Sequence, residues 1–204
     1  NGMVIPNHSK VSDLERMNAL GVTQYGQMTA GSYMYIGPQG IVHGTMITIL
    51  NAARKYLRRD SDSGLQGLRY VSSGLGGMSG AQAKAAVISG VTTIIAEVNK
   101  KAAEKRHQQG WVDLLTDRVD EAIDLLVKHS DASEAVSIGY IGNIVELWER
   151  LAERNIRVDL GSDQTSLHNP MNGGYIPVGM SLIESNDTMA NNNILFQNEV
   201  KKFQ

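Results

Sequence analysis

Short apolar runs alternate with longer helical patterns along the chain from about residue 69 onward. β-branched, nearly continuous apolar runs at 91–97, 135–141 and 158–160 are typical of buried strands, and another β-prone run starts at Arg69. Helical patterns lie between and after them at 81–89, 100–109, 117–128 and 143–154. This alternation indicates a mainly parallel sheet with helices on both faces. We therefore predict an α/β, doubly wound, Rossmann-like fold.

The two ends of the chain have a different pattern. A capping-box sequence, Ser12 to Glu15, predicts a short helix that ends near Gly21. Tyr33–Ile36 predicts a strand, and apolar spacing over 41–57, from Ile41 through Ile49 and Ala53 to Tyr56, predicts a helix that ends in the basic stretch 54–59.

From Ser181 the chain is polar and helical, and breaks are expected at Asn186-Asp187 and at 191–193. We expect 1–204 to be a single dinucleotide-binding domain taken from a longer chain. Within it we expect an N-terminal helical and linker segment at 1–30, a Rossmann-like core at 31–180 and a C-terminal helical segment at 181–204.

The strand that starts at Arg69 leads into a glycine cluster, Gly74-x-Gly76-x-x-Ser79, which is close to the dinucleotide-binding fingerprint. The first glycine permits a tight turn, and the second lets backbone N–H groups approach a pyrophosphate. A small third residue lets the next helix pack closely with its N-terminus toward the anion. Glycine-rich turns between strand and helix also arise from packing alone, so this alternative stays open.

Glu97 ends the next strand, about 20 residues after the glycine cluster, where a carboxylate that binds the adenosine ribose is expected. The alternative is a solvated residue at a strand end. Two further loops follow strands and therefore share the ligand-binding edge of a doubly wound sheet. One contains Gly142-Asn143, and the other is the long polar loop 161–170.

Composition narrows the classes of partner. The 204 residues carry a net charge of −2, with 42% hydrophobic and 20% charged residues, which gives no case for nucleic acid or an anionic membrane. The chain has no cysteine, which excludes disulfides, thiolate metal sites and a cysteine nucleophile within it. No His, Asp or Glu set has metal-ligand spacing. We expect a cytoplasmic location.

Four strings in this order resemble the urocanase family: 33–45 (YMYIGPQGIVHGT), 73–82 (SGLGGMSGAQ), 109–111 (QGW) and 162–170 (SDQTSLHNP). The similarity extends from roughly residue 20 to residue 184. The resemblance implies a tightly held NAD⁺ whose nicotinamide acts as an electrophile on the substrate imidazole and does not carry hydride. Water then adds to urocanate to give imidazolone propionate, in histidine degradation. The resemblance also implies a homodimer.

The resemblance implies cofactor contacts position by position. Gln39 reaches the cofactor, and Glu97 accepts two hydrogen bonds from the adenosine ribose. The pyrophosphate is wrapped by the main chain of Gly77, Met78 and Ser79. The remaining implied contacts, on the adenine side and along the cofactor, are Asn143, Ile144, Gln164, Thr165, Ser166, Leu167, His168, Tyr175 and Ile176.

Three departures from the family pattern matter. Ala102, beside Lys101, stands where the family often has a basic residue, and Gly173-Gly174 carries one glycine more than many relatives. The family's essential cysteine lies downstream of the matched region. We therefore expect no catalytic residue in this chain and no activity of the isolated segment.

Other readings stay open. The glycine cluster could serve a binding-only nucleotide domain or, more weakly, a dehydrogenase, which would form NADH. The charged run from Lys100 to Arg106 is expected to be a solvated helix face. Trp148 is expected to be a core residue of its helix.

Overall fold

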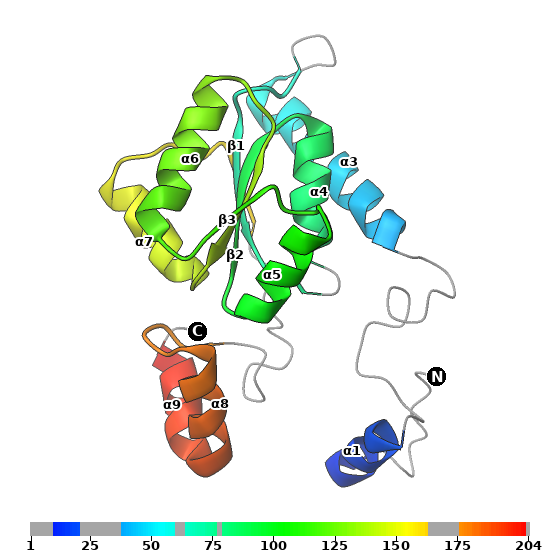
Figure 1. Ribbon diagram of the computed structural model, residues 1–204, viewed down its shortest axis with the longest axis vertical. Helices are drawn as coiled ribbons and strands as arrows, with labels where there is room; N and C mark the ends of the chain where they lie inside the picture. Colours follow the sequence, from blue (N-terminus) through cyan, green and yellow to red (C-terminus); the bar gives the residue numbers. More distant parts are fainter. Residues whose placement is uncertain (1–9, 21–37, 60–63, 77–78, 163–175, 203–204) are drawn as a thin grey trace. The chain divides into compact units, whose positions relative to one another are not determined.

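The computed structural model describes residues 10–20, 38–59, 64–76, 79–162 and 176–202, which are coloured in Figure 1. The chain divides into two compact units, residues 1–41 and residues 42–204. The first contains helix α1 (Val11–Ala19), close to the helix expected from the capping-box sequence. The second contains the sheet and the helices that cover it.

A five-stranded parallel sheet forms the centre of the second unit, in the order β3-β4-β2-β1-β5. Its strands are β1 (Arg69–Ser73), β2 (Thr92–Glu97), β3 (Leu114–Thr116), β4 (Ser137–Ile141) and β5 (Leu160–Gly161). β1 lies between β2 and β5, so the strand order reverses beside β1. Such a reversal is where doubly wound sheets open a crevice for ligands.

Helices cover both faces of the sheet, as Figure 1 shows. On one face lie α3 (Pro38–Leu57), α4 (Ala81–Ser89) and α5 (Lys100–Gln108), which share a core with Tyr70, Leu75 and Ile95. On the other lie α6 (Val119–Asp131) and α7 (Ile144–Glu153), packed on Val71 and Ile94. The doubly wound α/β prediction is confirmed, and its cause is the run of apolar residues that face both ways on each strand.

Helices α8 (Leu182–Asn191) and α9 (Asn193–Lys202) contact each other and bury Ser185 and Phe196. A capping box between Ser181 and Glu184 starts α8. The predicted break at 191–193 is confirmed by the boundary at Asn192. The predicted break at 186–187 is wrong, since both residues lie within α8, where helix contacts outweigh the weak helix propensity of Asn and Asp.

Three other local predictions differ from the structure. The helix expected over 41–57 begins earlier, at Pro38, because proline suits the first position of a helix. Gln39 therefore lies in the first turn of α3, where it is exposed. Tyr56, expected on the apolar face, is 70% exposed, and Ile49 and Ala53 form the buried stripe. The strand β3 was not predicted, because three residues are too few for a periodic signal. The strand expected at 33–36 lies outside the described residues.

Trp148 is partly buried against the α6 and α7 side of the core, so its predicted core role is confirmed. Among the residues that the structure describes, no helix combines the length and apolar character needed to cross a bilayer.

Candidate functional site

The glycine loop, residues 74–80, leaves β1 at the carboxyl edge of the sheet. Gly74 adopts a left-handed φ of +91°, which favours glycine, and its N–H donates to the carbonyl of Ala96 at 2.7 Å. A Cβ on Gly76 would meet only the Ser79 hydroxyl, at 3.8 Å, among the described residues. Packing within the described part therefore does not require glycine at this position, and space is left beside the backbone.

Glu97 lies at the end of β2, next to this loop. Its Oε2 accepts a hydrogen bond from the backbone N–H of Leu75 at 2.6 Å, and its Oε1 accepts from Asn99 N–H at 2.8 Å. The half-buried carboxylate therefore connects the loop after β1 to the loop after β2. The alternative of a merely solvated strand-end residue is wrong, because both carboxylate oxygens have defined partners.

Arg106 holds the other side of the glycine loop. From α5 its Nε donates to the carbonyl of Leu75 at 3.1 Å, and its Nη2 donates to the carbonyl of Gly76 at 2.7 Å. Gln109 accepts a third hydrogen bond, from Nη1, at 2.8 Å, and the guanidinium lies 5.5 Å from the centre of the Trp111 ring. The prediction of a solvated face over 100–106 is therefore wrong for Arg106. This arginine lies one helical turn beyond Ala102 on α5.

Gly80 shows how closely α4 approaches this arginine. A Cβ on Gly80 would overlap the Arg106 Nε and would lie 2.8 Å from the carbonyl oxygen of Gly76. The sequence assigned the need for a small residue to Ser79. The structure places the strictest packing at Gly80, one residue later, because the arginine fills the space between α4 and α5 there.

A partly buried polar network links Ser162, after β5, to β1 and α4. The hydroxyl of Ser162 lies 2.7 Å from the Tyr70 hydroxyl and 2.9 Å from the Ser72 hydroxyl. Both hydroxyls donate to Oε1 of Gln82, at 2.8 Å and 2.5 Å. Ser162, the residue after β5, is thereby held at the same edge of the sheet as the described part of the glycine loop. The sequence pattern contained no signal for this network.

Asn143 and Ile176, two of the predicted cofactor contacts, are in contact just after the end of β4. Asn143 caps α7 by accepting a hydrogen bond from Val145 N–H at 3.0 Å, and its Nδ2 donates to the carbonyl of Ile176 at 3.2 Å. Ile144, the first residue of α7, packs partly buried against the core on the α6 and α7 face. The strand register places the end of β4 beside Glu97, since Glu97 pairs with Ile141.

The remaining predicted residues are divided between the two units and the undescribed segments. Gln39 belongs to the unit 1–41, and Ser79 is half-buried in the glycine loop. Outside the described residues lie Gly77, Met78, Gln164, Thr165, Ser166, Leu167, His168 and Tyr175. Within the described ranges, no group of three or more His, Asp or Glu side chains could hold a metal ion.

Tyr140, near the end of β4, donates from its hydroxyl to Oε2 of Glu146 at 2.6 Å. Burial, followed by the hydrogen bond to the Glu146 carboxylate, raises the pKa of Tyr140 above its ordinary value. The phenol therefore stays protonated at neutral pH and acts here as a hydrogen-bond donor that ties β4 to α7.

Comparison with known proteins gives the family. Residues 37–203 match the family model described as the urocanase Rossmann-like domain, and residues 1–34 match the urocanase N-terminal domain. The chain belongs to the urocanase family. The resemblance read from the four sequence strings is thus confirmed, together with the Rossmann-like fold of this domain.

Relatives named urocanate hydratase share more than half of their aligned residues with this chain. The human urocanate hydratase is 56% identical over 207 residues, and the probable urocanate hydratase of Dictyostelium discoideum is 58% identical over 205 residues. Each alignment covers 99% of this chain but only 30% of the relative. This urocanase chain therefore spans about 30% of the length of the curated relatives it matches.

Proposed function

We propose that the carboxyl edge of the sheet binds NAD⁺ and that the chain serves as the NAD-binding part of a urocanate-hydrating lyase. The observation that carries the proposal is the direct hydrogen bond between Glu97 and the glycine loop at Leu75 N–H. A dinucleotide site needs a ribose-binding carboxylate beside a pyrophosphate-binding loop, and these two groups meet here.

The free capacity of Glu97 supports this assignment. An ionised carboxylate has about four lone-pair positions for hydrogen bonds. Among the described residues, Oε2 accepts one backbone hydrogen bond, from Leu75, and Oε1 accepts one, from Asn99. With respect to the described residues, a second position on each oxygen is left for a ribose hydroxyl, so the two adenosine ribose hydroxyls can bind without displacing the Leu75 contact.

The glycine loop fits a pyrophosphate. Among the described residues, a Cβ on Gly76 would meet nothing closer than the Ser79 hydroxyl, which leaves the kind of space that a phosphate needs. Gly80, the N-cap of α4, supplies no side-chain cap. Two N–H groups at this helix start are already used, since Gly80 donates to the Gly76 carbonyl and Gln82 donates to the Ser79 carbonyl. The helix dipole is therefore the feature of α4 that favours an anion here. Arg106 adds a positive charge behind the loop while it orients the carbonyls of Leu75 and Gly76 away from the ligand side.

The chemistry follows from the cofactor when it is bound: its nicotinamide supplies an electrophile that withdraws electrons from the substrate imidazole, so that water can add to urocanate. Glu97 orients the adenosine half. The network around Ser162 fixes where the polar loop begins, and that loop contains the residues proposed to line the cofactor, Gln164 to His168. We place Gln39, Gly77, Met78, Ser79, Asn143, Ile144, Tyr175 and Ile176 in the same proposed contact set.

The rest of the proposal concerns the whole enzyme. A cytoplasmic homodimer is the proposed assembly, and urocanate is the proposed small-molecule substrate. The chain has no cysteine. The family's cysteine would therefore come from the part of the relatives' length that this chain does not span, and the isolated segment is proposed to be inactive.

The test is calorimetric titration of NAD⁺ into the chain, and into Glu97→Gln. Loss of a charged acceptor for two hydroxyls should raise the Kd for NAD⁺ by about 10- to 100-fold. Glu149→Gln is the matched control, since Glu149 is exposed and has no hydrogen bond or ion pair to a described residue. Equal NAD⁺ affinity in the parent chain and in a folded Glu97→Gln would contradict the ribose assignment.

A second assay separates the lyase from a binding-only nucleotide domain and from a dehydrogenase. The full-length protein that contains this chain should remove the near-ultraviolet absorbance of urocanate without forming NADH. NAD⁺ binding without loss of urocanate would favour the binding-only domain.

A further inference from the structure

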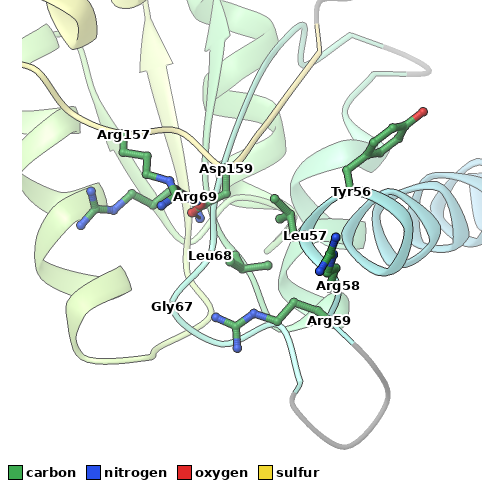
Figure 2. A pocket seen from close by; sticks show the side chains of 9 residues that line it. All are labelled: Tyr56, Leu57, Arg58, Arg59, Gly67, Leu68, Arg69, Arg157 and Asp159. Atoms are coloured by element: carbon green, nitrogen blue, oxygen red, sulfur yellow. Dashed lines mark hydrogen bonds and ion pairs between the residues drawn. The ribbon is translucent and has the colours of Figure 1, made fainter.

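A second charged hollow lies at the opposite, amino-terminal edge of the sheet. Its volume is about 480 Å³, within the range of small-molecule sites, and Figure 2 shows the side chains that line it. Leu57 and Leu68 contribute its apolar part, and Arg69, the first residue of β1, contributes to its wall. Because parallel strands all begin at this edge, the hollow is separate from the glycine loop.

Positive charge dominates this basic hollow. Its lining contains four arginines, Arg58, Arg59, Arg69 and Arg157, and one acidic residue, Asp159. The Arg69 guanidinium turns away to Ser130 and Asp131, so the basic groups of the hollow are those of the other three arginines. In Figure 2 the arginines come from separate parts of the fold: Arg58 and Arg59 follow α3, whereas Arg157 lies beside Asp159 on the approach to β5. Charged side chains from two segments far apart in the sequence therefore line one space.

Two of the four arginines have carboxylate partners, and the other two have none among the described residues. Arg69 pairs with Asp131 at 2.7 Å, and Arg157 pairs with Asp159 at 3.1 Å, while the other Asp159 oxygen accepts from Arg69 N–H. For Arg58 and Arg59, no carboxylate of a described residue lies within ion-pair distance. Basic residues in the last turn of a helix interact favourably with the helix dipole, which accounts for Arg54 and Lys55. It does not account for Arg157, which lies outside the helices.

The backbone of Arg58 is a second, independent observation. It has a left-handed φ of +55° directly after α3, and Arg59 N–H closes the turn by donating to the carbonyl of Ala53 at 3.2 Å. Glycine is the favoured residue at this position of a helix end, because it has no Cβ to oppose the left-handed conformation. Folding alone would favour glycine, yet an arginine stands here and lines the hollow.

We propose that the basic hollow binds a small organic polyanion, a phosphate ester or a polycarboxylate. Guanidinium groups bind both kinds of anion through paired hydrogen bonds, and the weakly hydrated arginine suits a partly enclosed site. Arg58, Arg59 and Arg157 supply the charge, and Leu57 and Leu68 contact the carbon part of the ligand. This proposal does not depend on the function proposed for the opposite edge.

The test is calorimetric titration with two probes, pyrophosphate and citrate, which separate phosphate from carboxylate ligands. Binding of at least one probe is expected, and Arg157→Gln and Arg58→Gly should each raise its Kd by roughly 10-fold or more. Arg54→Gln is the matched control, since it removes the same charge from an exposed arginine of α3 that does not line the hollow. Its Kd should stay unchanged.

Arg58→Gly also distinguishes binding from a structural role. Because glycine suits the left-handed turn, its melting temperature should rise by about 1 to 4 °C while binding is lost. Amide signals of Gly67 and Leu68 should shift on titration, and those of Gly74 and Gly76 should not. No binding of either probe at millimolar concentration would overturn the proposal, as would equal weakening by Arg54→Gln or shifts confined to the glycine loop.

Discussion

The contact between Arg106 and the glycine loop leads to the most direct stability prediction. We consider Arg106→Gln, which removes the charge and both hydrogen bonds to the carbonyls of Leu75 and Gly76. A hydrogen bond from a charged group contributes about 1.5 to 3 kcal/mol, and the half-buried position of Arg106 places these two at the low end. The contact with Trp111 adds roughly 0.5 kcal/mol.

The loss of side-chain entropy on ordering the arginine opposes this stabilisation. It costs about 2 kcal/mol when all rotamer freedom is lost, and less here because the planar guanidinium is preorganised. The net decrease in the free energy of unfolding should therefore be about 2 kcal/mol. For a chain of this length it corresponds to a melting temperature lower by roughly 4 to 8 °C. Lys105→Gln is the control, because Lys105 is exposed on the same helix and should change stability by less than about 0.5 kcal/mol.

Gly80→Ala tests the same geometry independently. Gly80 has a right-handed backbone, φ −54° and ψ −22°, at which alanine ordinarily stabilises by about 0.4 to 1 kcal/mol. Here the new methyl group overlaps Arg106 and the Gly76 carbonyl, so we expect destabilisation by about 1 to 3 kcal/mol. In the Arg106→Gln background the penalty should shrink by about 1 kcal/mol, as urea unfolding of the double-mutant cycle can measure. A stabilising Gly80→Ala in the parent chain would refute the packing argument.

Three further predictions use other parts of the fold. Gly74→Ala should destabilise the protein by about 1 to 3 kcal/mol in thermal denaturation, because the φ of Gly74 is +91°. Gly44→Ala should instead stabilise it by about 0.5 to 1 kcal/mol, because Gly44 has helical backbone and open space around it. Ser72→Ala removes a buried hydroxyl between Gln82 and Ser162 and should lower the unfolding free energy by about 1 to 2 kcal/mol in urea titration; no change would exclude a stabilising network. The hydrogen bond from Arg150 lowers the pKa of Asp120 below 3.8, so its contribution is present above that pH and is lost as the pH falls through the lowered value. Asp120→Asn should therefore reduce the fall in melting temperature on the acid side, and an unchanged acid profile would contradict this.

The sequence predicted most of the scaffold because local rules produce it. The predicted helix over 81–89 has the observed bounds, and the predicted strand over 91–97 differs from β2 by one residue. Apolar periodicity is read from neighbouring residues, so long elements are the most secure. The sequence also predicted that the glycine loop and Glu97 lie at one edge, since strand ends in a parallel sheet meet there, and the hydrogen bond between them shows this proximity.

Tertiary structure decided the contacts between segments far apart in the chain. No local pattern reveals that Arg106 reaches back 30 residues to Gly76, that Gly80 and not Ser79 is the tightest position, or that Ser162 joins a network with Tyr70. The same holds for the arginines of the basic hollow, which come together because α3 packs beside β1 and β5 pairs with β1. The physical reason is that side-chain hydrogen bonds and charge clusters depend on how helices pack on the sheet, whereas strand and helix patterns depend on adjacent residues alone.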